Sequence, residues 1–365
     1  MSYIKKVLRY SVLYTAKCLG LFSLSRYLTR SALRILCYHG AAIDDEYCYS
    51  PGTFMTGATF RRRMAFLKRW CPILGLDEAV QRQNDGTLPD HATVITIDDG
   101  WYGTYSVFFP VLKEFGFKAT LYITSYYVLK QTQVFNMFVG YLLWRHSDRS
   151  IDLAHIDSSL EGVFALSDPK DRGNAYKQIL TYAETALDAR DRQRLAERIA
   201  QELGHDVQHV CSARILALMT GEEIREMADS GIDIQLHTHR HRLPADDRRA
   251  MELEISENAA VLRELTRAPL VHLCYPSGFY VAQQLPWLEA LGLRTATTTM
   301  RGFNYPETPR LELRRFLDSE AICDIEFEAE LSGFFELIRR VGTRTAPQRS
   351  PALTRGTTGS QRSRE

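Results

Sequence analysis

The sequence predicts a parallel α/β fold, closed as a barrel or open, and three observations lead to this prediction. Short apolar runs rich in β-branched residues stop abruptly at polar or small residues. Helical patterns lie between these runs, so strands and helices alternate along the chain. The chain has 365 residues, of which 45% are hydrophobic and 11% aromatic. This composition is typical of globular proteins and excludes a wholly disordered or collagen-like chain.

The apolar runs do not alternate strictly with polar residues, which is typical of strands covered on both faces in a parallel sheet. The predicted strands are Leu33–Tyr38, Ala92–Ile97, Ala119–Ile123, Ile232–Leu236, Leu270–Tyr275 and Leu293–Ala296. The helical patterns cover Thr59–Trp70, Tyr105–Phe115, Gly221–Ser230 and Arg248–Thr266. In such folds chemistry gathers at the carboxyl ends of the strands. Here those ends hold His39, Asp98, Asp99, His237, His239, His241 and the turn Pro276-Ser277-Gly278.

Residues 130–217 interrupt the alternation with a mostly helical, charged segment that carries no recognisable chemistry. We expect a helical insertion between two strands, above or beside the catalytic face. It would form a wall on the substrate side or have no role in the reaction.

The N-terminal segment 1–31 is predicted to be a basic amphipathic helix. At helical spacing, its basic residues fall on one side and its apolar residues mostly fall on the other. The basic residues are Lys5, Lys6, Arg9 and Lys17, and the apolar residues are Ile4, Val7, Leu8, Val12, Tyr14, Leu19 and Phe22. Such a helix could lie on an anionic membrane surface, pack its apolar stripe against the protein, or be a cleaved signal, although Lys17 would split the apolar core of a signal. No uncharged apolar run of about 18 residues is present, so no transmembrane helix is predicted.

Charge and cysteine usage set further expectations. The tail 343–365 carries five Arg and one Glu, lacks aromatic residues and is predicted to be disordered. The formal net charge of the chain is +1, which argues against a nucleic-acid partner. The seven cysteines are scattered without a metal-binding spacing. Reduced thiols and a cytoplasmic location, with the inner membrane surface as an alternative, are therefore expected.

Two carboxylates stand side by side where a buried strand ends, in Thr96-Ile97-Asp98-Asp99-Gly100. Neighbouring side chains point to opposite faces of a strand, but a turn at the strand end can bring both toward one centre. One carboxylate could then bind a metal while the other takes a proton. Taken alone, the tripeptide also fits a simple turn with a helix-capping role.

Three histidines lie within five residues in His237-Thr238-His239-Arg240-His241. If the chain turns here, His237 and His241 converge as metal ligands; if it stays extended, all three share one face. A polar loop with incidental histidines is the structural alternative. With one Asp, two of these residues make a two-His, one-carboxylate set that suits Zn²⁺ and other divalent metals. Such a site supports hydrolysis of an amide or ester.

These motifs resemble those of the polysaccharide deacetylases (NodB homology, carbohydrate esterase family 4). Thr96–Gly100 is similar to the family's T-F-D-D-G, with Ile97 in place of Phe, and His237–His241 matches H-[ST]-x-x-H. The resemblance extends to Ile35-Leu36-Cys37-Tyr38-His39-Gly40, Lys118-Ala119-Thr120-Leu121-Tyr122-Ile123 and Cys274-Tyr275-Pro276-Ser277-Gly278. It implies a distorted (β/α) barrel over residues 32–342, with the helical insertion at about 130–217.

Roles for individual residues follow from the resemblance by position. It implies that Asp98 is the general base and that Asp99, His237 and His241 bind one divalent metal. The backbone N–H of Ser277 would help to hold the oxyanion. Zn is the expected metal, with Co, Ni or Mn as alternatives.

Two departures from the family pattern bear on the mechanism. The pattern R-x-P-[YF] reads Cys274-Tyr275-Pro276-Ser277, so the Arg that usually steadies the base is missing from this position. The L-x-H motif that supplies the usual general acid has no clear match, because Leu311–Arg315 reads Leu-Glu-Leu-Arg-Arg. His39 is the candidate general acid, and His272 is a weaker candidate that also fits a core position.

The resemblance thus predicts a metal-dependent hydrolase that removes N- or O-acetyl groups from a polysaccharide or lipid-linked sugar. Two alternatives stay open at this point. The same machinery could act on a non-sugar amide, or the chain could be a non-catalytic glycan-binding relative. The retained base and metal ligands argue against a pure binder.

Overall fold

The computed structural model describes the backbone of residues 3–345 and the side chains of residues 5–342. At its centre is a sheet of eight strands, all paired in parallel. The strands are β1 (Arg34–Tyr38), β4 (Ile73–Leu74), β5 (Thr93–Ile97), β6 (Thr120–Ile123), β9 (Asp233–Leu236), β10 (His272–Cys274), β11 (Thr295–Thr297) and β12 (Phe316–Leu317). Six of them overlap the predicted apolar runs, whereas β4 and β12 were not predicted from the sequence.

The sheet curls into the predicted distorted barrel. Its strand order is β11-β10-β9-β6-β5-β1-β12, with β4 also paired to β5. A parallel bridge between Thr297, in β11, and Leu313, shortly before β12, joins the two edges. Every residue of β1 and β5 is buried, which explains why these strands read as continuous apolar runs.

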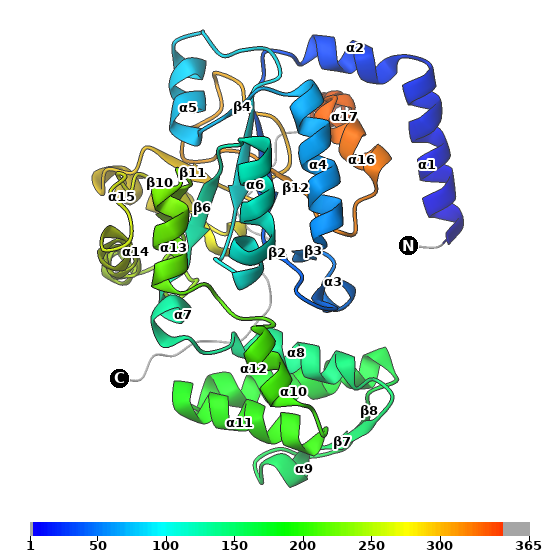
Figure 1. The fold of residues 1–365 in the computed structure, drawn as a ribbon, viewed down its shortest axis with the longest axis vertical. Helices are drawn as coiled ribbons and strands as arrows, with labels where there is room; N and C mark the ends of the chain where they lie inside the picture. The colour runs from blue at the N-terminus through cyan, green and yellow to red at the C-terminus, as the bar shows by residue number, and fades with distance from the viewer. Residues whose placement is uncertain (1–2, 346–365) are drawn as a thin grey trace.

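Helices surround the sheet (Figure 1). Those of the barrel are α4 (Gly57–Trp70), α5 (Leu76–Asn84), α6 (Phe109–Phe115), α13 (Gly221–Asp229), α14 (Arg248–Arg263), α15 (Leu285–Ala290), α16 (Asp324–Leu331) and α17 (Phe334–Thr345). Short elements β2 (Gly40–Ala41), α3 (Glu46–Tyr49) and β3 (Phe54–Met55) follow β1, and a π-helical turn at Thr104–Phe108 leads into α6. Local signals fix several helix starts: Thr220 and Glu223 form a reciprocal capping box at α13.

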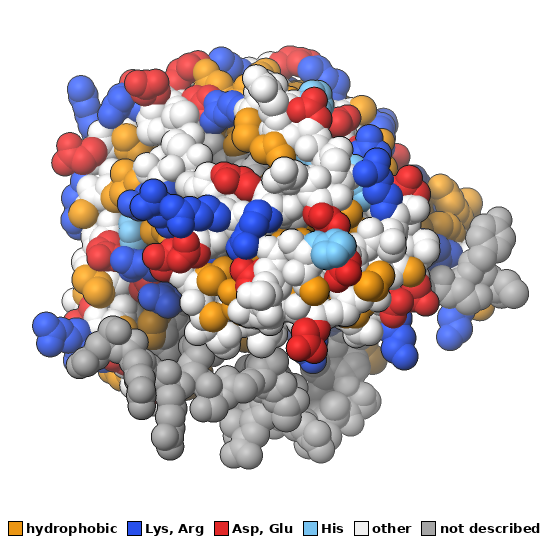
Figure 2. Space-filling model, turned by 90° about the horizontal axis from the view of Figure 1, so that it is seen from below, with side chains coloured by type: hydrophobic (Ala, Val, Ile, Leu, Met, Phe, Trp, Pro, Cys, Tyr) orange, Lys and Arg blue, Asp and Glu red, His pale blue; other side chains and the backbone are white. Residues whose placement is uncertain are grey.

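The segment between β6 and β9 forms a helical lobe at the lower end of the molecule in Figure 1. Its elements are α7 (Ser125–Lys130), α8 (Phe135–Arg145), β7 (Ser150–Asp152), α9 (Leu153–Ile156), β8 (Val163–Ala165), α10 (Pro169–Ala186), α11 (Ala189–Glu202) and α12 (Val207–Ala213). The lobe has its own hydrophobic cluster, to which Phe54 and Trp101 of the barrel also belong. Figure 2 looks onto this end, where acidic and basic side chains are interspersed.

The N-terminal segment is two helices rather than the single predicted one. A turn at Leu19 and Gly20, where Gly20 has a φ of 76°, separates α1 (Tyr3–Cys18) from α2 (Leu21–Leu28). Gly tolerates this left-handed backbone, which lets the chain bend. The pair packs on α16 and α17 at the outside of the barrel (Figure 1).

The inner face of α1 is also different from the expected apolar stripe. Leu13 and Ala16 are buried, whereas Val7, Leu8 and Val12 are exposed. The residues that turn inward lie next to Arg9 and Lys17, which form ion pairs with Glu326 and Glu328 of α16.

The tail residues 346–365 lie outside the described part of the chain, and α17 extends to Thr345. Among the described residues, no helix is long and apolar enough to cross a bilayer.

Candidate active site

The carboxyl ends of the strands open into a cavity of about 310 Å³. It collects residues from the carboxyl ends of β1, β5, β6, β9, β10 and β11 and from the helical lobe. Its lining includes His39, Thr53, Asp98, Asp99, Trp101, Tyr127, Asn136, Met137, His237, Arg240, His241, Tyr275, Ser277, Thr299 and Arg315. The structure therefore brings together all the residues that the sequence proposed for the site: the base, the three metal ligands, Ser277 and His39.

The two adjacent carboxylates reach the same cavity because the backbone turns sharply between them and the next helix. The N–H of Asp98 still bonds to the carbonyl of Tyr38 on β1. Asp99 then adopts a left-handed conformation with a φ of 74°, which is costly for a non-glycine residue. Thr238, His241 and Ser277 also have positive φ values, between 54° and 64°. Unfavourable backbone conformations are thus gathered at this cavity.

Asp99, His237 and His241 form a compact set of donor atoms. The Oδ1 atom of Asp99 lies 3.3 Å from Nε2 of His237 and 3.5 Å from Nε2 of His241. The ligand atoms of all three residues lie within 4.8 Å of one another. The other oxygen of Asp99, Oδ2, accepts a hydrogen bond of 2.8 Å from the indole Nε1 of Trp101. Oδ1 is thereby left to face the two imidazoles.

The orientation of the His237 imidazole and the lowered pKa of His241 suit metal binding. His237 donates from Nδ1 to the carbonyl of Cys274 at 2.8 Å, so its Nε2 faces Asp99. Metal-binding histidines are usually oriented in this way. Burial by itself would lower the pKa of His237, but the charge interaction with Cys274 and the hydrogen bonds to Asp99 and Cys274 raise it, so a cation would displace a proton from this imidazole. Burial, followed by the neighbouring His237, lowers the pKa of His241 and favours its neutral, metal-binding form. Two nitrogens and one carboxylate oxygen fit a divalent cation such as Zn²⁺.

The third histidine of the motif turns away from this set. Nδ1 of His239 lies 2.9 Å from Oγ of Ser125, and its backbone N–H bonds to the carbonyl of Glu254 on α14. Asn258 of α14 accepts from the N–H of His237 and donates to Ser125. The chain turns after β9 instead of remaining extended, so His237 and His241 converge while His239 helps to anchor the loop.

Asp98 lies deeper and is held by Arg315. Its two carboxylate oxygens accept hydrogen bonds from Nη1 and Nη2 of Arg315, each at 2.8 Å. The Asp98 side chain is 4% exposed and the Arg315 side chain is fully buried. Nη2 of Arg315 also lies 3.2 Å from Sγ of Cys274, the position at which the family pattern has its Arg. Arg315 thus brings a guanidinium to Asp98 from the residue that precedes β12.

Neither Arg315 nor Trp101 is a site residue that the sequence motifs predict. Arg314 and Arg315 directly precede the apolar pair Phe316-Leu317, but nothing local indicates which arginine turns inward. Trp101 follows the Asp-Asp-Gly turn, and that proximity was the available signal. The contact of Arg315 with Asp98 joins residues 217 positions apart, whereas the contact of Trp101 with Asp99 lies within one turn of the chain.

The surroundings of Asp98 keep it ionised. Burial by itself would raise its pKa, but the charge and hydrogen bonds of Arg315 lower the pKa of Asp98 to about 2. Two buried thiols, Cys37 and Cys274, each donate to Oδ2 at 3.4 Å. Because both oxygens are engaged by Arg315, Asp98 is less suited to bind a cation than Asp99 is.

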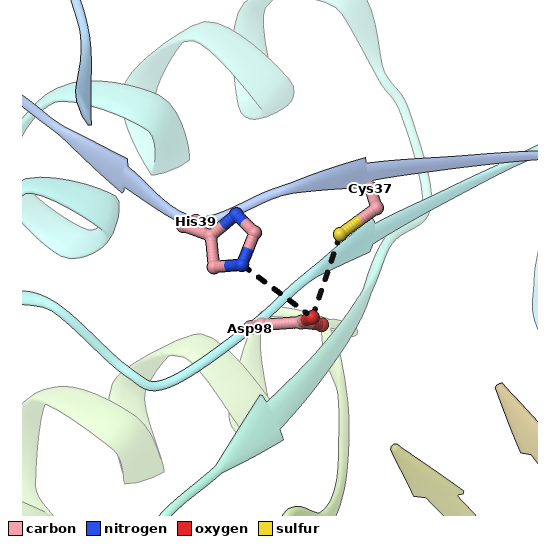
Figure 3. A group of neighbouring side chains, drawn as sticks. All are labelled: Cys37, His39 and Asp98. Atoms are coloured by element: carbon pink, nitrogen blue, oxygen red, sulfur yellow. Dashed lines mark hydrogen bonds and ion pairs between the residues drawn. The ribbon is translucent and has the colours of Figure 1, made fainter. Parts of the chain in front are cut away.

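His39 faces Asp98 from the end of β1 (Figure 3). Its Nε2 atom lies 4.0 Å from Oδ2 of Asp98, and its side chain is 24% exposed. Figure 3 also shows Cys37 approaching the same carboxylate from β1. His272, in contrast, is buried at the amino end of β10, where Nδ1 lies 2.8 Å from Oγ1 of Thr295. It does not line the cavity, so its candidacy as a general acid is wrong.

Ser277 lies in a tight turn that approaches Thr299. A Cβ added to the next residue, Gly278, would come within 2.1 Å of Oγ1 of Thr299, and Gly278 has a φ of 75°. Only glycine allows this close approach. The helical lobe closes the other side of the cavity through Tyr127 and Asn136.

Comparisons with known proteins find one matching family model and several solved structures with a similar fold. The family model described as "Polysaccharide deacetylase" matches residues 192–296, the part that holds His237, His241 and Ser277. No curated protein sequence matches the chain. The deacetylase PplD of Streptococcus pyogenes, solved in complex with acetate, is similar at 17% identity with a TM-score of 0.54, over 83% of this chain and 99% of that one.

Two further solved structures share the fold. IcaB from Ammonifex degensii is 16% identical over 82% of this chain and 97% of its own, with a TM-score of 0.52. A de-N-acetylase from Aggregatibacter actinomycetemcomitans is 12% identical over 82% of this chain and 99% of its own, with a TM-score of 0.50.

The shared fold and the matched segment indicate similarity to the polysaccharide deacetylases, which are hydrolases of carbon–nitrogen bonds other than peptide bonds. The resemblance to the polysaccharide deacetylase family is confirmed by the matched segment and by the shared barrel.

Proposed function

We propose that this protein is a metal-dependent deacetylase that hydrolyses N- or O-acetyl groups on a polysaccharide or lipid-linked sugar. One observation carries the proposal: Asp99, His237 and His241 converge on one point, while Asp98 beside them is held by Arg315 rather than by the histidines. A ligand set and a separate base are what metal-assisted hydrolysis requires.

Asp99, His237 and His241 would hold one divalent cation, with Zn preferred and Co, Ni or Mn as alternatives. The cation supplies Lewis-acid activation of water and of the acetyl carbonyl. Trp101 and the carbonyl of Cys274 support this set by fixing Asp99 and His237 in their orientations.

Asp98 takes a proton from the attacking water as general base. Its lowered pKa, about 2, keeps it ionised over the whole neutral range. The two hydrogen bonds from Arg315 hold the carboxylate in one orientation, which restricts the direction from which it accepts the proton.

His39 donates a proton to the leaving group as general acid. The oxygen of water forms a bond to the acetyl carbon, the carbon–nitrogen bond (or the ester carbon–oxygen bond) breaks, and the proton from His39 goes to the departing atom. The backbone N–H of Ser277 stabilises the negative charge that develops on the acetyl oxygen. His39 is well situated for this role because it lines the cavity within 4.0 Å of Asp98.

Polar groups on the lobe side of the cavity favour a sugar substrate. Tyr127 and Asn136 line it opposite the strand ends, together with Thr53. Hydroxyl and amide groups of this kind can bond to sugar hydroxyls, and a cavity of about 310 Å³ is in the range of small-molecule sites. A hydrolase of a non-sugar amide is the alternative that substrate screening would reveal.

Acetate release from a panel of acetylated glycans, with and without added metals, tests the proposal. We expect release that a chelator abolishes and Zn²⁺ restores, and about one divalent ion per chain by elemental analysis. His237→Gln should lower the metal content, whereas His239→Gln, altered in the same loop, should retain it. No release from any acetylated sugar, but hydrolysis of non-sugar amides, would overturn the substrate assignment.

The acid role of His39 has its own test. His39→Gln should lower the rate on N-acetyl sugars by about 10²-fold or more, the usual contribution of general acid catalysis. The same variant should hydrolyse an aryl acetate at nearly the wild-type rate, because a phenolate leaves without protonation. An equal loss on both substrates would contradict the assignment.

We further propose that the protein works in a reducing compartment, the cytoplasm, at or near the inner membrane. All seven cysteines lie among the described residues and are free thiols, which supports this location. Fractionation of cells followed by thiol labelling tests it, and recovery of the protein outside the cytoplasm would contradict it.

A further inference from the structure

The outward surface of α1 and α2 is apolar to an unusual degree. We define the α1–α2 face by nine large side chains that are between 38% and 71% exposed: Val7, Leu8, Val12, Tyr14, Leu19, Leu21, Leu24, Tyr27 and Leu28. Such a concentration within 22 residues is more than the scattered exposed hydrophobics of a globular surface. An exposed apolar surface of this size indicates a site of contact with a membrane or with another protein.

The orientation of α1 makes this surface. A helix on a protein surface normally buries its apolar stripe and exposes its charges. In α1 the inner side carries Leu13 and Ala16, which pack with Ile325 and Ala329 of α16. Much of the apolar stripe that the sequence shows is therefore free to face outward.

Ion pairs hold the helix in this orientation. Arg9 lies 2.8 Å from Glu326, and Lys17 lies 2.6 Å from Glu328. Both basic residues thus stand at the inner edges of α1, next to the barrel. The outermost residues of α1, such as Leu8 and Ser11, carry no charge.

The charged residues within α1 and α2 are all basic. Neither helix contains an acidic residue, and Lys5 and Lys6 are exposed near the start of α1. In α2 the guanidinium of Arg26 lies over Trp70, with its carbon 4.2 Å from the ring centroid. An apolar face with lysines and arginines at its edge is typical of helices that lie in the interface of an anionic membrane.

We propose that the α1–α2 face docks this protein onto the surface of a bilayer that contains anionic phospholipids. The apolar side chains enter the boundary between headgroups and acyl chains, and Lys5 and Lys6 face the phosphates. The proposal rests on and deepens the proposed function, because docking would hold the protein at the membrane in which a lipid-linked sugar is anchored. Binding can nevertheless be measured without turnover, so the two can fail separately.

Co-sedimentation of the full chain with vesicles tests the docking. Vesicles of phosphatidylcholine alone are compared with vesicles that contain phosphatidylglycerol at about 30%. We expect the wild type to bind the anionic vesicles more tightly and to be released by salt. Lys5→Ala/Lys6→Ala should weaken this binding by about fivefold for each lysine.

The apolar contribution is tested by Leu8→Glu/Leu24→Glu, which should weaken binding at least about tenfold to anionic vesicles. The matched control is Leu253→Glu, since Leu253 is 52% exposed on α14, outside this face. The control should bind as the wild type does. Circular dichroism and acetate release from a soluble substrate should be unchanged in both, which separates a docking defect from misfolding.

Three results would overturn the proposal. The wild type could fail to bind anionic vesicles, or Leu253→Glu could weaken binding as much as Leu8→Glu/Leu24→Glu does. The wild type could also fail to bind vesicles and form, by light scattering, a dimer that the Leu8→Glu/Leu24→Glu variant does not form. The face would then be a contact between two copies of the chain.

Discussion

Asp98 and Asp99 are neighbours in the sequence, but their carboxylates contact different groups in the cavity. Asp98, 4% exposed, is held by a guanidinium and two thiols. Asp99, 18% exposed, faces two imidazoles and an indole. One carboxylate is therefore committed to Arg315 and the other is available to a cation. The groups that face a carboxylate, rather than its place in a motif, decide what it can do.

The largest expected effect comes from Asp98→Asn. The amide cannot accept the proton from water, so the rate of acetate release should fall by about 10³-fold or more, toward the upper end of what a general base contributes. Metal content should stay near that of the wild type, because Asp98 is not in the ligand set. An unchanged rate, or loss of metal with the rate, would remove the distinction between the two carboxylates.

Arg315→Met comes next and tests how Asp98 is held. Removing one partner of a buried ion pair should lower the free energy of unfolding by about 3–5 kcal/mol, measured by denaturant titration. Asp98 would then keep its burial but lose the guanidinium, so its pKa should rise from about 2 toward and above the ordinary value. Because only the ionised carboxylate is a base, the acidic limb of the rate profile should move to higher pH.

A rearranged pair is the control for Arg315. Cys274→Arg/Arg315→Ala returns the guanidinium to the position that the family pattern uses, and Sγ of Cys274 already lies 3.2 Å from Arg315. We expect this double variant to recover part of the activity that Arg315→Ala loses. If Arg315→Met leaves the pH profile unchanged, Arg315 serves stability alone and does not position the base.

Trp101→Phe is expected to have the smallest effect and probes the Asp99 side. An aromatic ring remains at this position, but the hydrogen bond from the indole Nε1 to Oδ2 of Asp99 is lost. Metal affinity should fall about 10–100-fold, as for other groups that orient metal ligands. Competition with a chelator measures it, and the matched variant Trp70→Phe, on the surface of α4, should retain the wild-type affinity.

Much of the fold could be predicted because the strands are buried on both faces. Runs such as Ala92–Ile97 are apolar throughout, and β5 (Thr93–Ile97) lies within that run. The short strand β12 could not be found in the same way, because Phe316 and Leu317 are too few to form a pattern. The split of the first helix was also missed, since one Gly inside an amphipathic pattern is a weak signal.

The residues of the candidate site also differ in whether the sequence alone could predict them. His237, His241, Asp98 and Asp99 stand in motifs, so each could be singled out from neighbours a few residues away. Arg315 could not, because it meets Asp98 across 217 positions of sequence. The orientation of α1 was missed for the same reason: it depends on Glu326 and Glu328, which lie more than 300 positions away in the chain.

By itself, the sequence determined which segments become strands and which polar side chains stand at their carboxyl ends, because burial periodicity and strand termini are local properties of the chain. Tertiary structure alone decided which of those side chains meet. Closure of the barrel placed Arg315 on Asp98, the turn after β9 separated His239 from the other two histidines, and the acidic side of α16 turned the apolar stripe of α1 outward. Contacts of this kind depend on the positions of whole elements in space, which no stretch of neighbouring residues encodes.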